Sequence, residues 1–202
     1  MRLFSKKNHL PICAVLIFLL MACEKDSPKP KDENGFFDEY TSRHFKMGFT
    51  SWSFGPNPQD VSDTYSFLAT NSDIYAEHID ASIPWQAWMN DEPLPEAFTS
   101  EIAYRVSNKV AGSHLLLSVS LLNGLRKDLA TDFDGNIPNY TAFDDQPIED
   151  AYVKHLEYLL GQFDPDYLVM AIEANELAFH SMEKWEGYKR LIKKGEARIR
   201  TN

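Results

Sequence analysis

The feature that most constrains the fold is a fourfold alternation of short apolar segments with longer amphipathic ones. The short segments have the length of strands, and they are residues 45–50, 74–80, 115–122 and 167–172. The longer segments repeat apolar residues at the period of a helix, and they are residues 59–71, 97–111, 149–163 and 181–194. Strands that alternate with helices in this way form a parallel sheet through right-handed crossovers. We therefore predict an α/β fold.

Two segments add detail to this fold. Residues 115–122 (LLLSVSLL) are apolar at nearly every position, which is typical of a strand covered on both faces in a parallel sheet. Residues 123–147 are polar and rich in Asp, Asn and Gly, and they are too long for an ordinary connection. We expect a functional loop there.

Two architectures fit four strand–helix units. One is a small doubly wound sheet, and the other is the first half of an eightfold barrel, which needs about 250 residues in full. A glycine-rich nucleotide fingerprint follows none of the strands, so the doubly wound sheet has no ligand signature. Polar and aromatic residues instead gather after each strand, where barrel enzymes build their sites. We predict an incomplete (β/α)8 (TIM) barrel of about four units, within residues 36–202.

The N-terminal segment is typical of an export signal. Arg2, Lys6 and Lys7 precede an apolar run at residues 11–22, which is too short to span a membrane as a helix. The run ends in Leu-Met-Ala-Cys at 20–23, which resembles the lipobox of bacterial lipoproteins. That resemblance implies a cleaved signal peptide (1–22), a diacylated Cys23 and a lipid-anchored protein of the bacterial cell envelope, at the outer membrane or the periplasmic face. A buried helix or an uncleaved anchor is the alternative. Residues 23–35 are charged and proline-containing, which predicts a flexible tether.

Composition excludes several classes of function. With 20 basic and 30 acidic residues the formal charge is −10, which disfavours nucleic acid as a partner. Two cysteines exclude a disulfide scaffold or a multi-cysteine zinc site. The motifs of serine hydrolases and phosphate loops are absent. Glu77, His78 and Asp80 lie close together but lack the spacing of paired metal ligands, so we expect no metal and no cofactor.

Residues Ile172-Glu-Ala-Asn-Glu-Leu177 resemble a motif of a known family. An Asn-Glu pair closing the fourth strand is the signature of clan A glycoside hydrolases. Residues 47–52 (MGFTSW), 78–80 (HID) and 83–85 (IPW) agree with the same pattern. Across residues 44–192 the chain resembles bacterial lipoproteins similar to arabinogalactan endo-galactanases and cellulase-like enzymes. The resemblance implies that Glu176 is the general acid/base and that Asn175 hydrogen-bonds the sugar 2-hydroxyl.

Other side chains are candidates for substrate binding, each with a structural alternative. Trp52 and Trp85 have the aromatic surface that stacks on a sugar, although Trp85 and Trp88 equally fit a helix–sheet gap. His78 and Asp80 are candidates for substrate positioning. Asn123 and Arg126 follow the third strand and can contact hydroxyls, although Arg126 can equally pair with the acidic loop. Glu176 has the alternatives of capping a helix or facing water.

Strand geometry raises a question about the motif itself. Alternation along a strand puts Asn175 and Glu176 on opposite faces. For both side chains to face one substrate, a bulge or the transition from strand to loop must therefore turn one of them to the other face.

One catalytic group lacks a partner. Retaining enzymes of this kind use a second carboxylate, about 5 to 5.5 Å from the acid, which this clan places on its seventh strand. Residues 193–202 have no strand pattern. Glu77, Asp80 and Glu173 are the candidates expected near Glu176 in the fold, and nothing in their spacing favours any of them as the nucleophile. We expect a truncated glycoside hydrolase-like protein that acts on or binds polysaccharide and is inactive alone. The alternative is a non-catalytic glycan-binding surface lipoprotein. Because four open strands leave two edges and an apolar face uncovered, a poorly folding fragment is a third reading.

Overall fold

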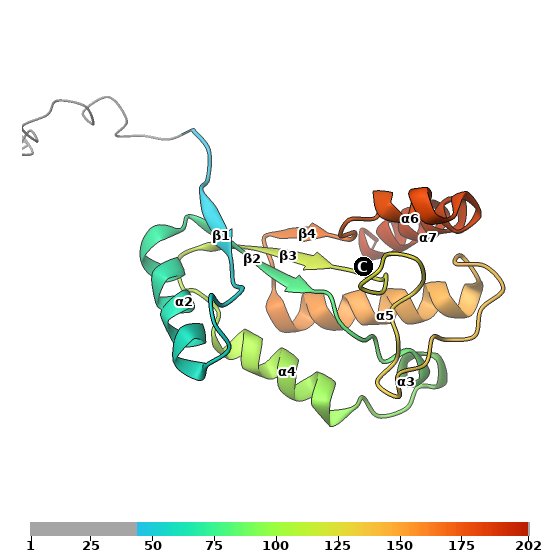
Figure 1. Cartoon of the computed structure of the whole chain (residues 1–202), viewed down its shortest axis with the longest axis horizontal. Coiled ribbons are helices and arrows are strands. Elements are labelled where there is room, and N and C mark those ends of the chain that lie inside the picture. Colours follow the sequence, from blue (N-terminus) through green and yellow to red (C-terminus); the bar gives the residue numbers. More distant parts are fainter. Residues whose placement is uncertain (1–43, 202) are drawn as a thin grey trace, which may run out of the picture. The chain divides into compact units, whose positions relative to one another are not determined.

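A four-stranded parallel sheet forms the centre of residues 44–201, the part of the chain that this computed structural model describes (Figure 1). Its strands lie in sequence order, and they are β1 (Gly48–Thr50), β2 (Ile74–Ile79), β3 (His114–Val119) and β4 (Tyr167–Val169). All three pairings are parallel, so the predicted α/β fold is confirmed. The order shows no reversal and hence no switch point of a doubly wound sheet. The expected signal peptide, Cys23 anchor and tether lie outside the described residues.

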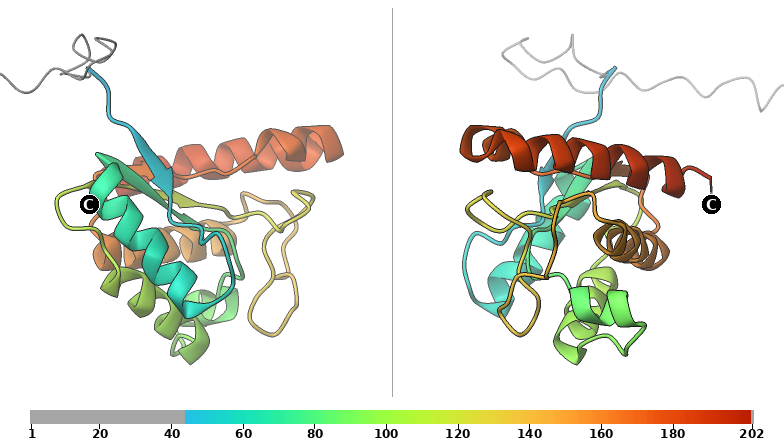
Figure 2. Two further views of the ribbon diagram at one scale, coloured as in Figure 1. Left: turned by 60° about the vertical axis from the view of Figure 1, so that its left-hand side comes forward. Right: turned by 90° about the vertical axis from the view of Figure 1, so that its right-hand side faces the viewer.

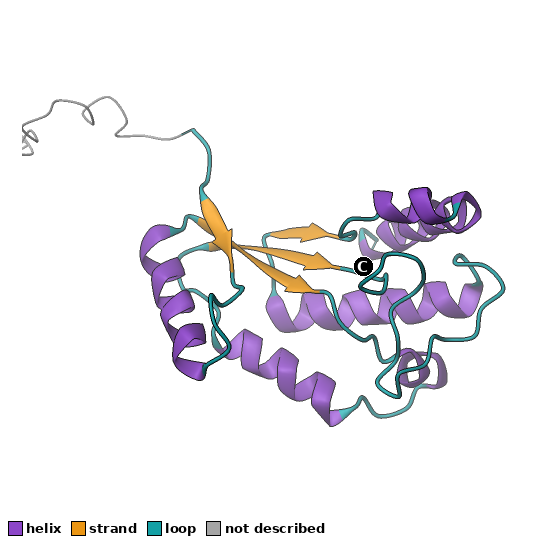
Figure 3. Ribbon diagram, viewed as in Figure 1, coloured by secondary structure: helices purple, strands orange, loops and turns teal. Residues whose placement is uncertain are grey.

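Six helices accompany the strands within residues 44–201 (Figure 3). The four predicted helices are confirmed with shifted ends, as α2 (Pro58–Asn71), α4 (Glu96–Ser107), α5 (Gln146–Phe163) and α7 (Met182–Ile199). Two helices of six residues, α3 (Trp85–Asn90) and α6 (Asn175–His180), were not predicted because each is too short to show a helical period. None of the six is long and apolar enough to cross a membrane.

The helix ends follow from local hydrogen bonds and from contacts. α2 begins one residue early because the Asp60 carboxylate accepts from the Asn57 N–H at 3.1 Å and Pro58 fits the first turn. α7 continues five residues past the predicted end. Its last turns are held against the start of α5, because Lys194 and Arg198 both pair with Glu149 there.

The strands are shorter than the apolar segments that predicted them. β3 ends at Val119, and the chain then turns back so that Leu122 bridges Leu129 in antiparallel fashion. β4 ends at Val169, three residues before the predicted end. An apolar segment therefore marked the buried stretch of chain, of which the hydrogen-bonded strand is only a part.

Helices α2, α4 and α5 lie on one side of the sheet (Figure 2). Side chains of β2 alternate accordingly: Tyr75, Glu77 and Ile79 are buried, while Ile74, Ala76 and His78 are half-buried. The prediction that β3 is covered on both faces is wrong for its first half, where Leu115 and Leu117 are fully buried but His114 and Leu116 are not. Right-handed crossovers between neighbouring strands keep successive helices on the same side, which leaves the opposite face open.

One charged group is built into the covered face. Glu77 on β2 is 1% exposed, and its carboxylate accepts from the Tyr65 hydroxyl at 2.7 Å and from Arg105 Nη1 at 3.1 Å. These bonds tie β2 to α2 and α4. Burial, together with the hydrogen bond to Glu77, raises the pKa of Tyr65 well above its ordinary value. Glu77 therefore belongs to the packing between sheet and helices and is not available to a ligand.

Candidate functional site

The side chains singled out from the sequence follow the carboxyl ends of the four strands. Because the strands are parallel, these ends lie at one edge of the sheet (Figure 1), here called the carboxyl edge. Trp52 follows β1, His78 and Asp80 close β2, Asn123 and Arg126 follow β3, and Glu173 to Glu176 follow β4.

Arg126 is the centre of the carboxyl edge. Its side chain is 8% exposed and forms two bonds with Asp80, from Nη1 at 2.9 Å and from Nη2 at 2.6 Å. Nε and Nη2 also donate to Glu173 Oε2, at 3.1 and 2.9 Å. Nη1 donates to the Asn123 carbonyl oxygen at 3.1 Å. These bonds use every N–H direction of the guanidinium. Arg126 therefore joins the ends of β2, β3 and β4 and has no donor left for a ligand.

This ion cluster holds the backbone in an uncommon conformation. Arg126 has a φ of 54° and Glu173 a φ of 49°, and both values lie in the left-handed region that residues with a Cβ avoid. Each such residue costs free energy unless its surroundings hold it in place. The hydrogen bonds with Asp80 raise the pKa of Arg126, so the guanidinium keeps its charge. The carboxyl edge is thus held by a permanent ion cluster.

Asn123 supports the same turn. Its side-chain oxygen accepts from the Lys127 N–H at 3.1 Å, and its carbonyl oxygen accepts from the Arg126 N–H at 2.8 Å. The half-buried Asn123 side chain therefore shapes the loop that presents Arg126.

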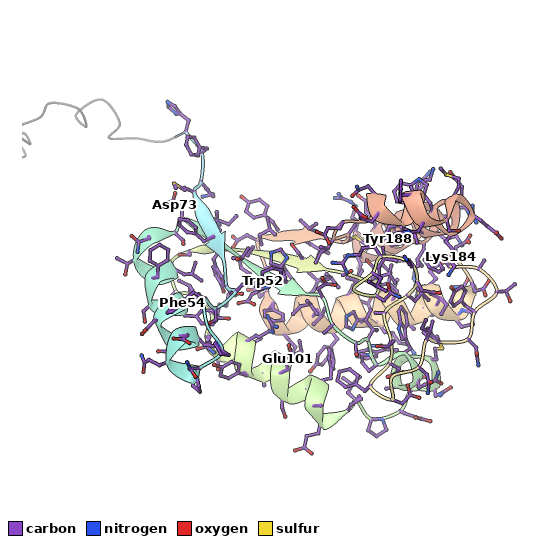
Figure 4. The ribbon with its side chains drawn as sticks, in the orientation of Figure 1. Trp52, Phe54, Asp73, Glu101, Lys184 and Tyr188 are labelled. Carbon is purple, nitrogen blue, oxygen red and sulfur yellow. The ribbon has the colours of Figure 1, made fainter. Side chains whose placement is uncertain are left out.

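The two tryptophans expected to face a substrate differ in exposure. Trp52 is 66% exposed (Figure 4). Its ring centroid lies 5.4 Å from that of the half-buried His78. Trp85 is fully buried at the start of α3, where its Nε1 donates to the Ala130 carbonyl oxygen at 2.8 Å. Of the two readings of Trp85, packing between elements is the one that the structure shows. Trp52 is the exposed aromatic surface of the carboxyl edge.

Asn175 and Glu176 begin α6, six and seven residues after the end of β4. Neither residue lies on a strand, so the alternation of faces does not separate them, and both side chains are exposed. The Glu176 N–H donates to the Glu173 carbonyl oxygen at 3.1 Å. Within residues 44–201 the Glu176 carboxylate forms no hydrogen bond or ion pair.

A second polar cluster lies beside the first and was not found from the sequence. Asp128 accepts from Lys184 Nζ at 2.6 Å and from the Tyr140 hydroxyl, which links the loop after β3 to α7. Burial, the largest single influence, would raise the pKa of Asp128, but the hydrogen bonds from Lys184, Tyr140 and the Leu129 N–H together outweigh it and the pKa is lowered. The long polar loop is therefore fastened at this point, and no sequence spacing connects three residues so far apart.

Metal ligation is not supported around these carboxylates. Across residues 44–201 no group of three or more His, Cys, Asp or Glu side chains is arranged to hold a metal ion. Asp80 is paired with Arg126, and Glu77 is buried among α2 and α4.

Comparison with protein-family models, with curated proteins and with solved structures finds no match to this chain. The chemistry of the carboxyl edge must therefore be inferred from its own side chains.

Proposed function

We propose that the carboxyl edge binds polysaccharide and carries the acid/base half of a glycosidase site. In this proposal the four strands are the first half of a (β/α)8 barrel. Their all-parallel pairing in sequence order is the order that such a barrel requires, and barrel enzymes bind substrates at the carboxyl ends of the strands. The observation that carries the proposal is the exposed Trp52 indole, held against His78 at that edge.

Trp52 and the ion cluster offer complementary contacts to a sugar. An indole face is a large rigid apolar surface, suited to the C–H face of a pyranose ring. The Glu173 side chain is 66% exposed and Asp80 is 23% exposed, and Arg126 bonds only Oε2 of Glu173. A carboxylate has about four acceptor sites, so both groups keep lone pairs for sugar hydroxyls.

Catalysis demands more than binding. A glycosidase acid must be protonated when the substrate binds, and enzymes achieve this by burying the carboxyl in apolar surroundings. Glu176 is exposed here. We therefore propose that Glu176 becomes an acid only with apolar surroundings and a second carboxylate beside it, which residues 44–201 do not supply in one copy or in two. The described strands alone would bind polysaccharide without cleaving it.

The required second carboxylate is not supplied by the ion cluster. Asp80 Oδ2 and Glu173 Oε2 lie 2.6 and 2.9 Å from the same Arg126 Nη2, so they are at most about 5.5 Å apart, no farther than the carboxylates of a retaining pair. Arg126 pairs with both carboxylates, however, whereas a retaining enzyme needs one of its two carboxyl groups to donate a proton. We assign Asp80 and Glu173 to binding.

Binding is tested by affinity electrophoresis and calorimetry on β-linked galactan, glucan and mannan. We expect at least one of the three to bind, and Trp52→Ala to weaken the affinity by roughly tenfold, about 1.4 kcal/mol, through the loss of stacking. Tyr104→Ala is the matched control, because Tyr104 is 53% exposed on α4, away from the carboxyl ends of the strands. If none of the three polysaccharides binds, or if Trp52→Ala binds like the unsubstituted chain, the assignment is wrong.

Turnover is measured separately by the release of reducing sugar. We expect none from this chain, and we expect Glu176→Gln to leave binding unchanged. Turnover that Glu176→Gln abolishes would show that the acid operates with the side chains of this chain alone and would contradict the binding-only role.

Attachment to the cell envelope is a separate proposal, which depends on Leu20 to Cys23. Two acyl chains on Cys23 would anchor the protein, because each buried methylene contributes about 0.8 kcal/mol. In a bacterial host we expect the full chain in the membrane fraction and Cys23→Ser in the soluble fraction. Equal partition of the two proteins would refute lipid anchoring.

A further inference from the structure

The two edge strands, β1 and β4, leave the sheet open on both sides. Each is three residues long and pairs with one neighbour only, so one row of its backbone N–H and C=O groups lacks a strand partner within residues 44–201. The face opposite α2, α4 and α5 is uncovered near both edges, where Thr50, Tyr167 and Val169 are exposed. Exposed edges and apolar surface of this kind mark a place where further protein packs.

The shapes of the two edges are complementary. At the β1 edge, Phe49 and Phe67 of α2 are 42% and 49% exposed, with their ring centroids 5.3 Å apart, so they form an apolar projection. At the β4 edge, a groove of about 690 Å³ runs between the strand and α7. Its apolar lining is Leu168, Met170 and Ala171 beside Ile192 and Ile199.

Charges at the amino ends of the same two strands are opposite. Lys46 precedes β1, whereas Asp166 precedes β4, where its carboxylate bonds to His114 and stays 42% exposed. Glu196 borders the groove paired with Arg200, so it adds no net charge there. If the two edges meet in parallel, these amino ends come together and opposite charges face each other.

We propose that the occupant of both edges is a second copy of this chain. β1 of one copy pairs in parallel with β4 of the other, and a twofold axis along the strands repeats the contact, so eight strands close into a barrel. The β4 groove lies between the strand and α7, and β1 with α2 offers it a parallel strand together with the projecting Phe49 and Phe67. Pairing β4 with β4 would leave both β1 edges open, whereas the β1–β4 contact uses every edge.

Closure also fills the uncovered face. The inside of an eight-stranded barrel is just wide enough to be filled by side chains. The open face supplies the apolar Ile74, Ala76, Leu116, Tyr167 and Val169 from each copy, together with the polar Thr50, His78, His114 and Ser118. The proposal rests on the barrel architecture proposed above and does not depend on sugar binding.

The test is the molar mass of the full chain by size-exclusion chromatography with light scattering. We expect twice the 23.2 kDa of one chain. Thr50→Lys and Val169→Glu each place a charge at an exposed position of an edge strand, on the face that closure buries, so each should fold and run as a monomer. The double variant should return to a dimer, because each interface then pairs the introduced lysine of one copy with the introduced glutamate of the other.

Tyr104→Glu is the control, since this exposed position lies on α4, and it should remain dimeric. Far-UV circular dichroism checks that the single variants are folded. A monomeric unsubstituted chain at a loading concentration of about 100 µM, where a specific interface of standard size is populated, would overturn the proposal. A dimer that survives both edge substitutions, or an assembly that grows beyond two copies, would overturn it as well. Polysaccharide binding has its own readout, so the two proposals fail independently.

Discussion

Replacing Arg126 with Met should destabilise the protein by about 2 to 3 kcal/mol and abolish polysaccharide binding. The substitution preserves most of the apolar stem but removes the cation shared by Asp80 and Glu173. Removing one partner of a fully buried pair costs about 3 to 5 kcal/mol. The smaller figure applies here because Glu173 is 66% exposed and water can solvate it. The left-handed turn at Glu173 would also lose its support, and Glu173 to Glu176 would leave their positions.

Urea unfolding measures the stability change, and calorimetry with the bound polysaccharide measures the binding change. Arg190→Met is the matched control, because Arg190 forms a similar two-bond pair with Asp144 but is 55% exposed. Exposed pairs contribute about 0 to 1 kcal/mol, so this variant should unfold close to the unsubstituted protein. Equal unfolding midpoints for Arg126→Met and Arg190→Met would show that the Arg126 cluster does not hold the carboxyl edge.

Acid should destabilise the fold through a single histidine on α5. His155 is fully buried, both of its ring nitrogens lack a hydrogen-bond partner, and its ring packs against Trp88 and Phe98. Burial lowers its pKa from 6.5 to about 3. The folded protein therefore keeps this ring neutral between these values, while the unfolded chain takes up a proton. The contribution of His155 to the free energy of unfolding is complete above pH 6.5 and is lost progressively as the pH drops towards 3.

We expect His155 to lower the free energy of unfolding by about 2 kcal/mol at pH 5 and by about 4 kcal/mol near pH 3, since one pKa unit is equivalent to about 1.4 kcal/mol. His155→Leu removes the group while keeping an apolar side chain of similar size. The difference in unfolding free energy between the two proteins should be constant above pH 7 and shift in favour of the variant below pH 6.5. Urea titrations at pH 8, 6, 5 and 4 provide the measurement.

His180→Leu is the comparison for this experiment, because His180 is exposed at the end of α6 and should leave the pH profile unchanged. If His155→Leu and the unsubstituted protein lose stability in parallel between pH 7 and pH 4, the buried ring is not the source of acid sensitivity.

Periodicity alone determined the four strand–helix units, their parallel direction and most helix ends. The end of α5 has a local cause as well, since Pro165 cannot continue the helix and Asp164 adopts a φ of 43°. These features depend on residues within about one helical turn of each other, which is the range over which hydrophobic period and capping act. Because all four strands run in the same direction, the polar residues that follow them gather at the carboxyl edge.

Only the tertiary structure decided which of those residues meet. Arg126 lies 46 residues from Asp80 and 47 from Glu173 along the chain, and no local pattern pairs them. The same holds for Trp52 and Trp85, which are chemically alike but differ from 66% exposed to fully buried. It holds also for β3, whose apolar sequence predicted cover on both faces although one face is open over its first half. Ion pairing and burial depend on distances between segments that folding brings together, and those distances are set by packing, not by sequence spacing.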